Sequence, residues 1–566
     1  PDEPLGDPVE VDTKTVAQTS LLITEFGPLG SEALMARVFE QQAAAISGGT
    51  FVSNQNVRMG DEVVPGFGPD NLSALDQRFA ATTPSPSPTA SPSPSPTASP
   101  SPTASPSPSA SPTPSPTASP TPSKFGALQT IASANLSTID ASTTIQTDPS
   151  ITRNGETGFG RIYRGPAQDG PASEYFFGSS SGFDSTSGFQ PHFSDTVRLP
   201  MAAFKFQTLQ LAGDPLISTA NGGAPHLALI AVSGITSGAG GALTFGELQQ
   251  LLLATQNGSI NLGSGISFED VPALYVYARG MGSTLTIDSA ISGTRDLFLV
   301  AEGNLQATDS LDVTQETTDG QTRGLNIVLR AGGAINIGGD LLLTTDASNI
   351  ENGANLIVTS VGSMSIGGDF ISTVGGASGT TGTGGNIDVR SGGSLGAGSV
   401  ELNAFFDPSL GVTNGGNVSL TVAGSLGTTE GGVTLFHSTP VNRTLTSGAN
   451  LTLTVAGTLE TAPNRRVDLT VVNTINTNVV NGANIVAAIG GNVNSGPLLL
   501  ALDNGSNGGI VTGGNLTLDV AGNLTASTLT MRIGNSPGRI QTGGNMTFRV
   551  GAGLFTSGSA QFLIDN

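Results

Sequence analysis

The sequence predicts an all-β fold, a parallel β-helix (solenoid) of about 30-residue turns, and three observations support this prediction. A Gly-Gly/Ala-Asn tripeptide returns at a nearly fixed interval through the second half of the chain. Apolar residues stand at constant distances from its asparagine. Glycine occurs 78 times in 566 residues, about twice its usual share of ~7%. A fixed period of this size is typical of repeat architectures, so we expect stacked turns.

Each repeat begins at an asparagine or, in one case, an aspartate, and successive members are 29 to 34 residues apart. An asparagine beside glycine at a corner can adopt the left-handed backbone conformation, and its amide can stack on the equivalent amide of the next turn. We therefore favour a structural ladder over the alternative, a row of glycosylation acceptors, which four members followed by x-Ser/Thr would allow. The nine ladder positions are Asp296, Asn326, Asn355, Asn386, Asn417, Asn450, Asn484, Asn515 and Asn545.

Three columns of the repeat are apolar in all nine copies, at one, three and nine residues after the ladder position. Glycine stands seven residues after it in eight copies, and Ala552 is the exception. This pattern indicates a strand with alternating inward and outward side chains, then a sharp corner and another inward residue. A second strand follows a segment of variable length, at 341–343, 400–402, 433–435, 467–471, 498–502, 529–533 and 562–564.

Weaker copies of the repeat at 226–231 and 273–278 extend the solenoid toward the N-terminus. Between them, residues 245–254 have apolar side chains at helical spacing (245, 248, 251 and 252), which predicts a short helical insertion. The outward columns are apolar in the early turns and rich in threonine in the later ones. We expect the helix, helped by residues 176–193, to cover the apolar columns with Leu248, Leu251 and Leu252 turned inward, which leaves the later turns free for lateral contacts.

Composition divides the chain into four parts. Residues 1–81 predict a loosely ordered segment or a small domain with one helix that begins after Ser31. Residues 82–123 contain only Pro, Ser, Thr and Ala, which predicts a disordered, polyproline-II-like spacer that spans on the order of 100 Å. Residues 124–225 should cap the solenoid, and 226–566 should form its repeats. Because no polar cap follows the last apolar strand, we expect the rod to continue beyond Asn566.

The composition also excludes several classes of function. The chain has no cysteine, and hence no disulfide framework and no cysteine nucleophile. Its 21 Lys+Arg against 43 Asp+Glu give a net charge of -22, which leaves no basic surface for nucleic acid. No apolar run approaches the ~18 residues that span a bilayer. Scarce lysine with abundant Thr, Ser, Asn and Gly fits an exported bacterial protein, although the chain begins at Pro1 without a leader peptide.

Two repeats carry a resemblance to a known family. Gly-Gly-Asn515-Leu-Thr-Leu-Asp-Val-Ala-Gly-Asn-Leu and Gly-Ala-Asn450-Leu-Thr-Leu-Thr-Val-Ala-Gly-Thr-Leu resemble the haemagglutinin-type repeats of filamentous-haemagglutinin-like adhesins and large bacterial exoproteins. The resemblance covers about residues 226–566. It implies a right-handed parallel β-helix, secretion or surface exposure, and a role in adhesion or cell-surface structure. The chain lacks the Asn-Pro motif of the two-partner-secretion domain and has no Arg-Gly-Asp tripeptide, so neither the secretion route nor an integrin-type contact carries over.

Parallel β-helices also include polysaccharide lyases and hydrolases, whose carboxylates gather on one outer face across neighbouring turns. Here we interpret Asp388 with Arg390 as an ordinary exposed pair rather than as a catalytic remnant. Only five of the 18 outward positions that lie two and four residues after a ladder position are charged, namely Arg330, Asp388, Arg390, Asp519 and Arg549.

Metal chemistry has little support in the sequence. The histidines His192, His226 and His437 have no metal-ligand spacing, and His192 with Asp195 is the nearest approach to a pair. Calcium-binding nonapeptide repeats are absent. The acidic positions Glu269-Asp270 and Asp503 could hold an ion only singly. We therefore expect no catalytic residue, no metal site and no cofactor.

These observations lead to one hypothesis and one alternative. The hypothesis is a non-enzymatic, exported bacterial β-solenoid, a structural or adhesin-like protein that is extracellular or displayed on the cell surface. Its expected partners are a host or neighbouring cell surface, a glycan or matrix component, or further copies of itself, with no nucleic acid and no membrane span. The alternative is a β-helix module that binds or cleaves carbohydrate; the absence of Trp and the presence of only 4 Tyr count against sugar stacking.

Overall fold

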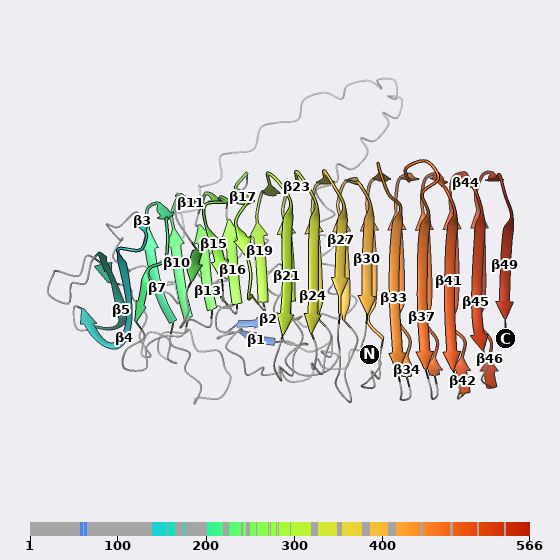
Figure 1. Ribbon diagram of the computed structural model, residues 1–566, viewed down its shortest axis with the longest axis horizontal. Coiled ribbons are helices and arrows are strands. Elements are labelled where there is room, and N and C mark those ends of the chain that lie inside the picture. The colour runs from blue at the N-terminus through green and yellow to red at the C-terminus, as the bar shows by residue number, and fades with distance from the viewer. Residues whose placement is uncertain are drawn as a thin grey trace, which may run out of the picture.

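The computed structural model describes residues 57–59, 62–64, 138–153, 156–164, 174–175 and, with short gaps, 201–565. In the first 81 residues it describes the antiparallel pair of β1 (Val57–Met59) and β2 (Glu62–Val64). The helix predicted after Ser31, the spacer at 82–123 and the segment 176–193 lie outside the described residues. From residue 201 onward the described chain forms the predicted right-handed parallel β-solenoid (Figure 1).

Three long parallel sheets form the sides of the rod. The asparagine sheet contains the ladder positions and consists of β7 (Met201–Phe206), β10 (His226–Ala231), β13 (Gln250–Thr255), β16 (Ala273–Ala278), β19 (Asp296–Ala301), β22 (Asn326–Ala331), β25 (Asn355–Ser360), β28 (Asn386–Ser391), β31 (Asn417–Val422), β35 (Asn450–Val455), β39 (Asn484–Ile489), β43 (Asn515–Val520) and β47 (Asn545–Val550). Its strands stack in the order of the chain.

The second side, the corner sheet, has short strands: β3 (Thr138–Ile139), β8 (Leu209–Leu211), β11 (Gly234–Ser237), β14 (Ser259–Leu262), β17 (Thr284–Ile287), β20 (Asn304–Ala307), β23 (Ile335–Ile337), β26 (Met364–Ile366), β29 (Leu395–Ala397), β32 (Leu426–Thr428), β36 (Leu459–Glu460), β40 (Val493–Ser495), β44 (Leu524–Ala526) and β48 (Leu554–Thr556). For this side, the sequence pattern predicted only one inward residue after the glycine corner, whereas the structure has a short strand there.

The third side, the long-strand sheet, contains the predicted second strand of each repeat: β12 (Ala242–Thr244), β15 (Ser267–Glu269), β18 (Ala290–Ile291), β21 (Leu311–Thr317), β24 (Leu341–Ala347), β27 (Phe370–Val374), β30 (Val400–Phe405), β33 (Val433–Val441), β37 (Val467–Ile475), β41 (Leu498–Ser506), β45 (Leu529–Ser536) and β49 (Ala560–Asp565). The last four turns before β47 contain a separate fourth sheet, whose short strands lie in the chain between a long strand and the next strand of the asparagine sheet. They are β34 (Leu445–Ser447), β38 (Val479–Asn481), β42 (Gly509–Thr512) and β46 (Arg539–Thr542).

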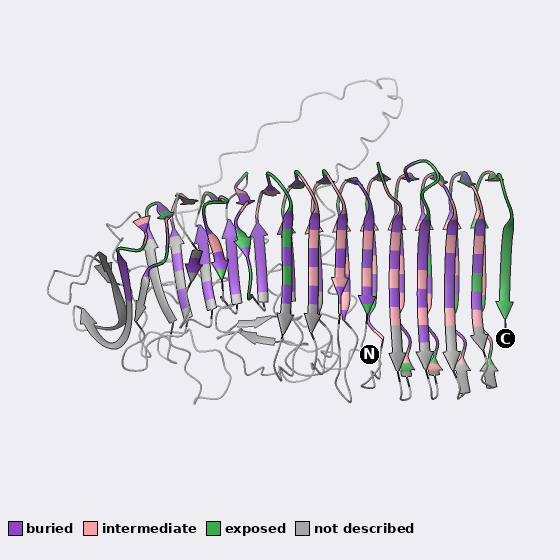
Figure 2. Ribbon diagram, viewed as in Figure 1, coloured by how far each residue is buried: buried purple, intermediate pink, exposed green. Residues whose placement is uncertain are grey.

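Buried residues alternate with less buried ones along many strands of the three sheets (Figure 2), and the buried apolar residues form one continuous core. In the asparagine sheet, Leu297 pairs with Ile327 and Ile327 with Leu356, and all three side chains are fully buried. Such columns repeat at each inward position, so every turn buries its apolar face against the turns above and below it. At ~4.8 Å per strand, the 13 strands of the asparagine sheet make a rod of about 60 Å.

The helical insertion predicted at residues 245–254 is wrong. Residues 250–254 belong to β13, which pairs in parallel with β10 on one side and β16 on the other, while 245–249 lie outside the described residues. Leu251 and Leu253 face the core and are fully buried. The sequence of a short apolar run does not distinguish a buried strand from a buried helix, because both can bury consecutive residues. The early turns are therefore shorter than predicted, with Gln250 paired to Ala273, 23 residues later.

The outward columns of the early turns are buried, as predicted, although the predicted helix does not cover them. Phe298 and Val328 are each 2% exposed and Ile357 is 4% exposed. Tyr275 stacks on Phe298 with ring centroids 4.7 Å apart, and the Tyr277 hydroxyl donates a hydrogen bond to Glu302. From β28 onward most outward residues are polar and half-buried, and Val486 and Ala488 of β39 are the apolar exceptions. Only the later turns thus present this side to solvent.

The sheets also extend back beyond residue 226, where the repeats were predicted to begin. β7 pairs in register with β10, and β3 pairs with β8. Within the region predicted to cap the solenoid, a small sheet at the N-terminal end of the rod has the strand order β6-β5-β4-β9. Its strands are β4 (Thr143–Arg153), β5 (Glu156–Arg164), β6 (Glu174–Tyr175) and β9 (Leu216–Ser218).

Candidate functional site

Six of the nine predicted ladder residues are joined by amide hydrogen bonds. The Nδ2 of Asn417 donates to Oδ1 of Asn386 at 3.1 Å, and Asn450 donates in the same way to Asn417 at 2.8 Å. The series continues through Asn484, Asn515 and Asn545 with distances of 2.8 to 2.9 Å. Each amide from Asn417 to Asn515 therefore donates to the preceding turn and accepts from the next one, and this hydrogen bond engages the nitrogen that glycosylation would modify.

The other three positions, Asp296, Asn326 and Asn355, are in register with Asn386 along the backbone, and their side chains lie outside the described residues. The predicted left-handed conformation is wrong. Among the residues that the structure describes, Asn464 is the one non-glycine residue with a positive φ, 63°. The ladder residues are the first residues of their strands, where extended backbone already aligns their amides along the rod.

Glycine seven residues after the ladder position is explained by close approach between turns. The backbone N–H of Ser425 donates to Oγ of Ser394, and that of Thr458 donates to Oγ of Ser425, both at 3.1 Å. A Cβ at Gly424 would lie 2.5 Å from Ser394 Oγ. Glycine thus leaves room for the side-chain oxygen of the preceding turn, which satisfies a corner N–H.

The predicted pair is present on the outer side of β28, where it is half-buried rather than exposed. Arg390 Nε lies 3.0 Å from Asp388 Oδ1, and Ser419 Oγ donates to the same carboxylate oxygen at 2.7 Å. Neighbouring turns place Thr452 and Thr454 in the same columns. The Asp388 carboxylate thus contacts Arg390 and Ser419 of the rod itself. The adjacent outward residues carry hydroxyl groups, so this side of the rod is a polar surface.

The structure places the candidate metal ligands apart. His437 lies in the core and is fully buried, and desolvation lowers its pKa from 6.5 to about 3. Asp503 forms an ion pair with Arg532, and Glu269 accepts a hydrogen bond from Ser267. Over the described part of the chain, no group of three His, Asp or Glu side chains is placed to hold a metal ion. His192 and Asp195, the nearest pair in the sequence, lie outside the described residues.

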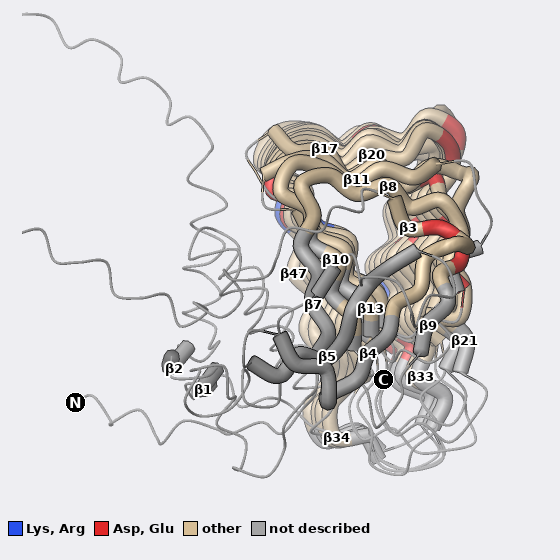
Figure 3. The backbone as a smooth tube through the Cα atoms, turned by 90° about the vertical axis from the view of Figure 1, so that its left-hand side faces the viewer, with Lys and Arg blue, Asp and Glu red and all other residues tan. Residues whose placement is uncertain are grey.

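The structure also shows a surface groove, here called the notch, on the side of the rod opposite the asparagine sheet. The sequence analysis did not predict it. It is a groove of about 560 Å³ at the corner between the corner sheet and the long-strand sheet, an edge along which acidic residues gather (Figure 3). The notch is lined by Asp369, Ser399, Glu401, Glu430, Gly431, Gly432, Thr434, Asn464, Arg465, Arg466 and Pro497.

Unequal corner loops form this notch. Two residues join β29 to β30, four join β32 to β33, six join β36 to β37, and again two join β40 to β41. The two longer loops stand out from the rod between shorter corners, and the longest contains Asn464 in the left-handed conformation. The sequence showed that the loops differ in length. It did not show that these loops lie side by side at the same corner of the rod.

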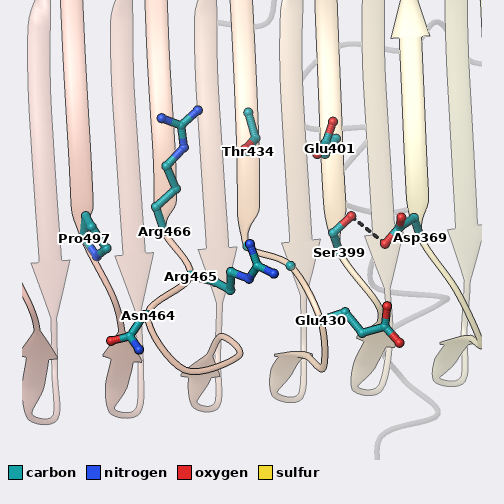
Figure 4. A pocket seen from close by; sticks show the side chains of 11 residues that line it. Asp369, Ser399, Glu401, Glu430, Thr434, Asn464, Arg465, Arg466 and Pro497 are labelled. Atoms are coloured by element: carbon teal, nitrogen blue, oxygen red, sulfur yellow. Dashed lines mark hydrogen bonds between the residues drawn. The ribbon is translucent and has the colours of Figure 1, made fainter.

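Charged groups of both signs face the notch (Figure 4). On one wall, Ser399 Oγ donates to Asp369 at 2.8 Å, beside Glu401. On the other wall, Arg466 pairs with Asp468 at 3.1 Å. Within the part of the chain that the structure describes, none of Glu401, Glu430 and Arg465 takes part in an ion pair. The notch can therefore both donate and accept strong hydrogen bonds.

An aromatic pair lies on the same outer face. Phe405 is on the same strand as Glu401, and its ring centroid is 5.3 Å from that of Phe436 on the next turn, with the ring planes tilted by 42°. Phe405 is 42% exposed, so its ring presents an apolar surface to solvent on this face.

Comparison of the chain with known proteins gave no matching family model, no similar curated protein and no similar solved structure. Among the described residues, no helix is long and apolar enough to cross a membrane. The strand order shows that the chain is a parallel β-solenoid repeat protein. The features that bear on its role are those of the rod surface.

Proposed function

We propose that the protein is a non-enzymatic, exported β-solenoid that serves as a structural or adhesin-like rod on the surface of a bacterium or outside it. The observation that carries the proposal is the regular outer flank of the later turns. Parallel, in-register stacking places the outward hydroxyl of Ser419 beside that of Thr452, and that of Thr421 beside that of Thr454, at the ~4.8 Å strand spacing. Such a flank suits lateral contact with an extended surface, whereas a reaction needs convergent groups.

The resemblance of the repeats to filamentous-haemagglutinin-like adhesins supports the same location and role. So does the low lysine content with no cysteine, because a chain without thiols folds independently of the redox state outside the cell. Expected partners are a host or neighbouring cell surface, a glycan or matrix component, or another copy of the rod.

Surface display is tested on intact cells of the producing bacterium with an antibody against the full chain, before and after external protease treatment. We expect labelling of intact cells that protease removes, together with specific retention of the purified chain on a cell or matrix surface. Labelling that requires cell lysis would contradict the proposed location.

The non-enzymatic part of the proposal has a separate test. Purified protein is incubated with a panel of acidic and neutral polysaccharides, and new reducing ends or unsaturated products are measured. We expect no turnover. Turnover that is lost in Asp388→Asn, which removes the carboxylate between Arg390 and Ser419, would replace the structural role with the carbohydrate-cleaving alternative.

A further inference from the structure

The notch and the aromatic pair occupy one continuous outer face. Glu401 and Phe405 both point outward from β30, four residues apart, which is about 13 Å along the strand. On β33, Thr434 is the register neighbour of Glu401, and Phe436 is the neighbour of Asn403, one outward position before Phe405. Across the strands, Asp369 and Arg466 lie three turns apart, about 14 Å. One ligand that contacts both the charged notch and the aromatic pair must therefore be an extended molecule.

We propose that this face binds a neutral oligosaccharide of at least three units. The notch is lined by the carboxylates of Asp369, Glu401 and Glu430 and by the guanidinium groups of Arg465 and Arg466. Charges of both signs therefore face a ligand, and neither sign alone selects a strongly charged one. A sugar hydroxyl both donates and accepts, and it can donate to Glu401 or Glu430 while it accepts from Arg465. The apolar face of a sugar ring fits against the exposed ring of Phe405.

An extended peptide would also be long enough, but the backbone of this face has little to offer it. Peptides that lie along a sheet gain affinity from main-chain hydrogen bonds at an open strand edge. Here β30 is paired on both sides, with β27 and with β33, so its amide and carbonyl groups are already used. Recognition has to come from side chains, and side chains of both signs beside an aromatic surface match a hydroxyl-rich ligand.

The volume of the notch agrees with this assignment. At about 560 Å³ it falls within the usual range of small-molecule sites, ~300–1,000 Å³, and its polar lining would hold one end of the ligand. The remaining units would extend over Asn403 and Thr470, which flank Phe436 in the adjoining turns. The site is independent of the proposed structural role, because a rod without it would stack in the same way.

The test uses the full chain on an array of neutral and acidic oligosaccharides, followed by calorimetry with the best neutral ligand and with its monosaccharide. We expect binding of neutral ligands of three or more units and none of the monosaccharide. Phe405→Ala and Glu430→Gln should each weaken binding about tenfold or more, because each removes one contact class. Glu430→Gln changes an exposed loop residue, so its effect does not depend on a change in folding.

Two matched controls lie away from this face. Phe555→Ala removes another exposed phenylalanine, and Glu460→Gln neutralises an exposed carboxylate on the corner sheet. Both should bind as tightly as the original chain. Absence of neutral-glycan binding, binding that survives Phe405→Ala and Glu430→Gln, or selective capture of peptides or acidic glycans would each overturn the assignment. Surface labelling of intact cells is unaffected by these outcomes, so failure of this site is distinguishable from failure of the proposed function.

Discussion

Individual polar residues inside the rod have consequences that follow from burial alone. His437 is an inward residue of β33, and its register neighbours are Ala404 and Val471. In the earlier turns, the buried side chains of Gln315, Thr345 and Ser372 have polar atoms without a hydrogen-bond partner. Burying such groups costs free energy that the apolar columns around them have to offset.

His437 should make the rod less stable in mild acid. Its pKa is lowered to about 3 by burial, so the unfolded chain binds a proton below about pH 6.5 that the folded chain excludes. Stability is therefore complete above pH 6.5 and falls as the pH decreases toward 3, by ~1.4 kcal/mol per pH unit. At a pH two units below 6.5 the loss should be about 2–3 kcal/mol.

Urea denaturation at neutral pH and two units below pH 6.5 measures this contribution when the original chain is compared with His437→Leu. The variant should lose less stability between the two conditions, by about 2–3 kcal/mol. An equal loss in both proteins would show that His437 is protonated or solvated in the folded rod.

Thr345→Val should stabilise the rod. Valine has nearly the shape of threonine and removes a fully buried hydroxyl that has no partner, so we expect a gain of about 1 kcal/mol. Thr373→Val, on the outer side of the adjacent β27, is the control and should change the free energy of unfolding by less than ~0.5 kcal/mol. A loss of stability in Thr345→Val would indicate that ordered water satisfies the hydroxyl.

At the scale of strands and corners, stability comes from contacts that repeat between neighbouring turns. The asparagine ladder joins the first residues of successive strands, and the corner glycines admit a side-chain oxygen from the turn before. A substitution at one turn therefore affects that turn and its two neighbours.

Asn450→Ala should break the ladder at two points. Asn417 loses its donor and Asn484 loses its acceptor, so the free energy of unfolding should fall by about 1–2 kcal/mol. Asn545→Ala removes only the last bond and should cost less than half as much. Chemical denaturation of both variants provides the comparison, and equal losses would mean that the amides do not act as a connected series.

Gly424→Ala should be much more damaging than Gly427→Ala in the same turn. A Cβ at Gly424 meets Ser394 Oγ at 2.5 Å and its backbone nitrogen at 2.7 Å, whereas nothing lies within 4 Å of a Cβ at Gly427. We expect a loss of about 2 kcal/mol or more for the first and less than ~0.5 kcal/mol for the second. Thermal denaturation of the pair is the measurement, and similar melting temperatures would contradict close packing at this corner.

For the molecule as a whole, the repeat separates stability from surface chemistry. Every turn contributes inward apolar columns, while loops and outward positions vary without disturbing the stack. Unequal corner loops thus produce the notch, and the outer side of the asparagine sheet changes from buried aromatic residues to half-buried hydroxyls. We therefore expect a partner to contact the rod at these variable positions.

The net charge of -22 predicts that the rod does not bind nucleic acid. Without a basic face there is no release of counterions from phosphates to drive association. A mobility-shift experiment with double-stranded DNA at ~50 mM salt, where electrostatic binding is strongest, should show no retarded band. A shift that disappears as salt is added would reveal a basic surface beyond the described residues.

The sequence alone determined the repeat, its inward columns and the ladder positions. In a parallel solenoid, residues that pair are one period apart, so Asn417 and Asn450 occupy equivalent positions in both the sequence and the structure. The side chain of each turn then meets its own counterpart, and the pattern along the chain is also the pattern of contacts. For this reason the fold was largely predictable.

Only the tertiary structure decided the early turns and the notch. Residues 250–254 are a strand because β10 and β16 supply backbone hydrogen bonds on both sides, a condition that the apolar run itself does not contain. The notch forms from loops of different turns, and Glu401 and Arg465 both line it although they are far apart in the sequence. Their proximity depends on how far each loop projects from the rod, which is fixed by packing between turns and not by the period of the repeat.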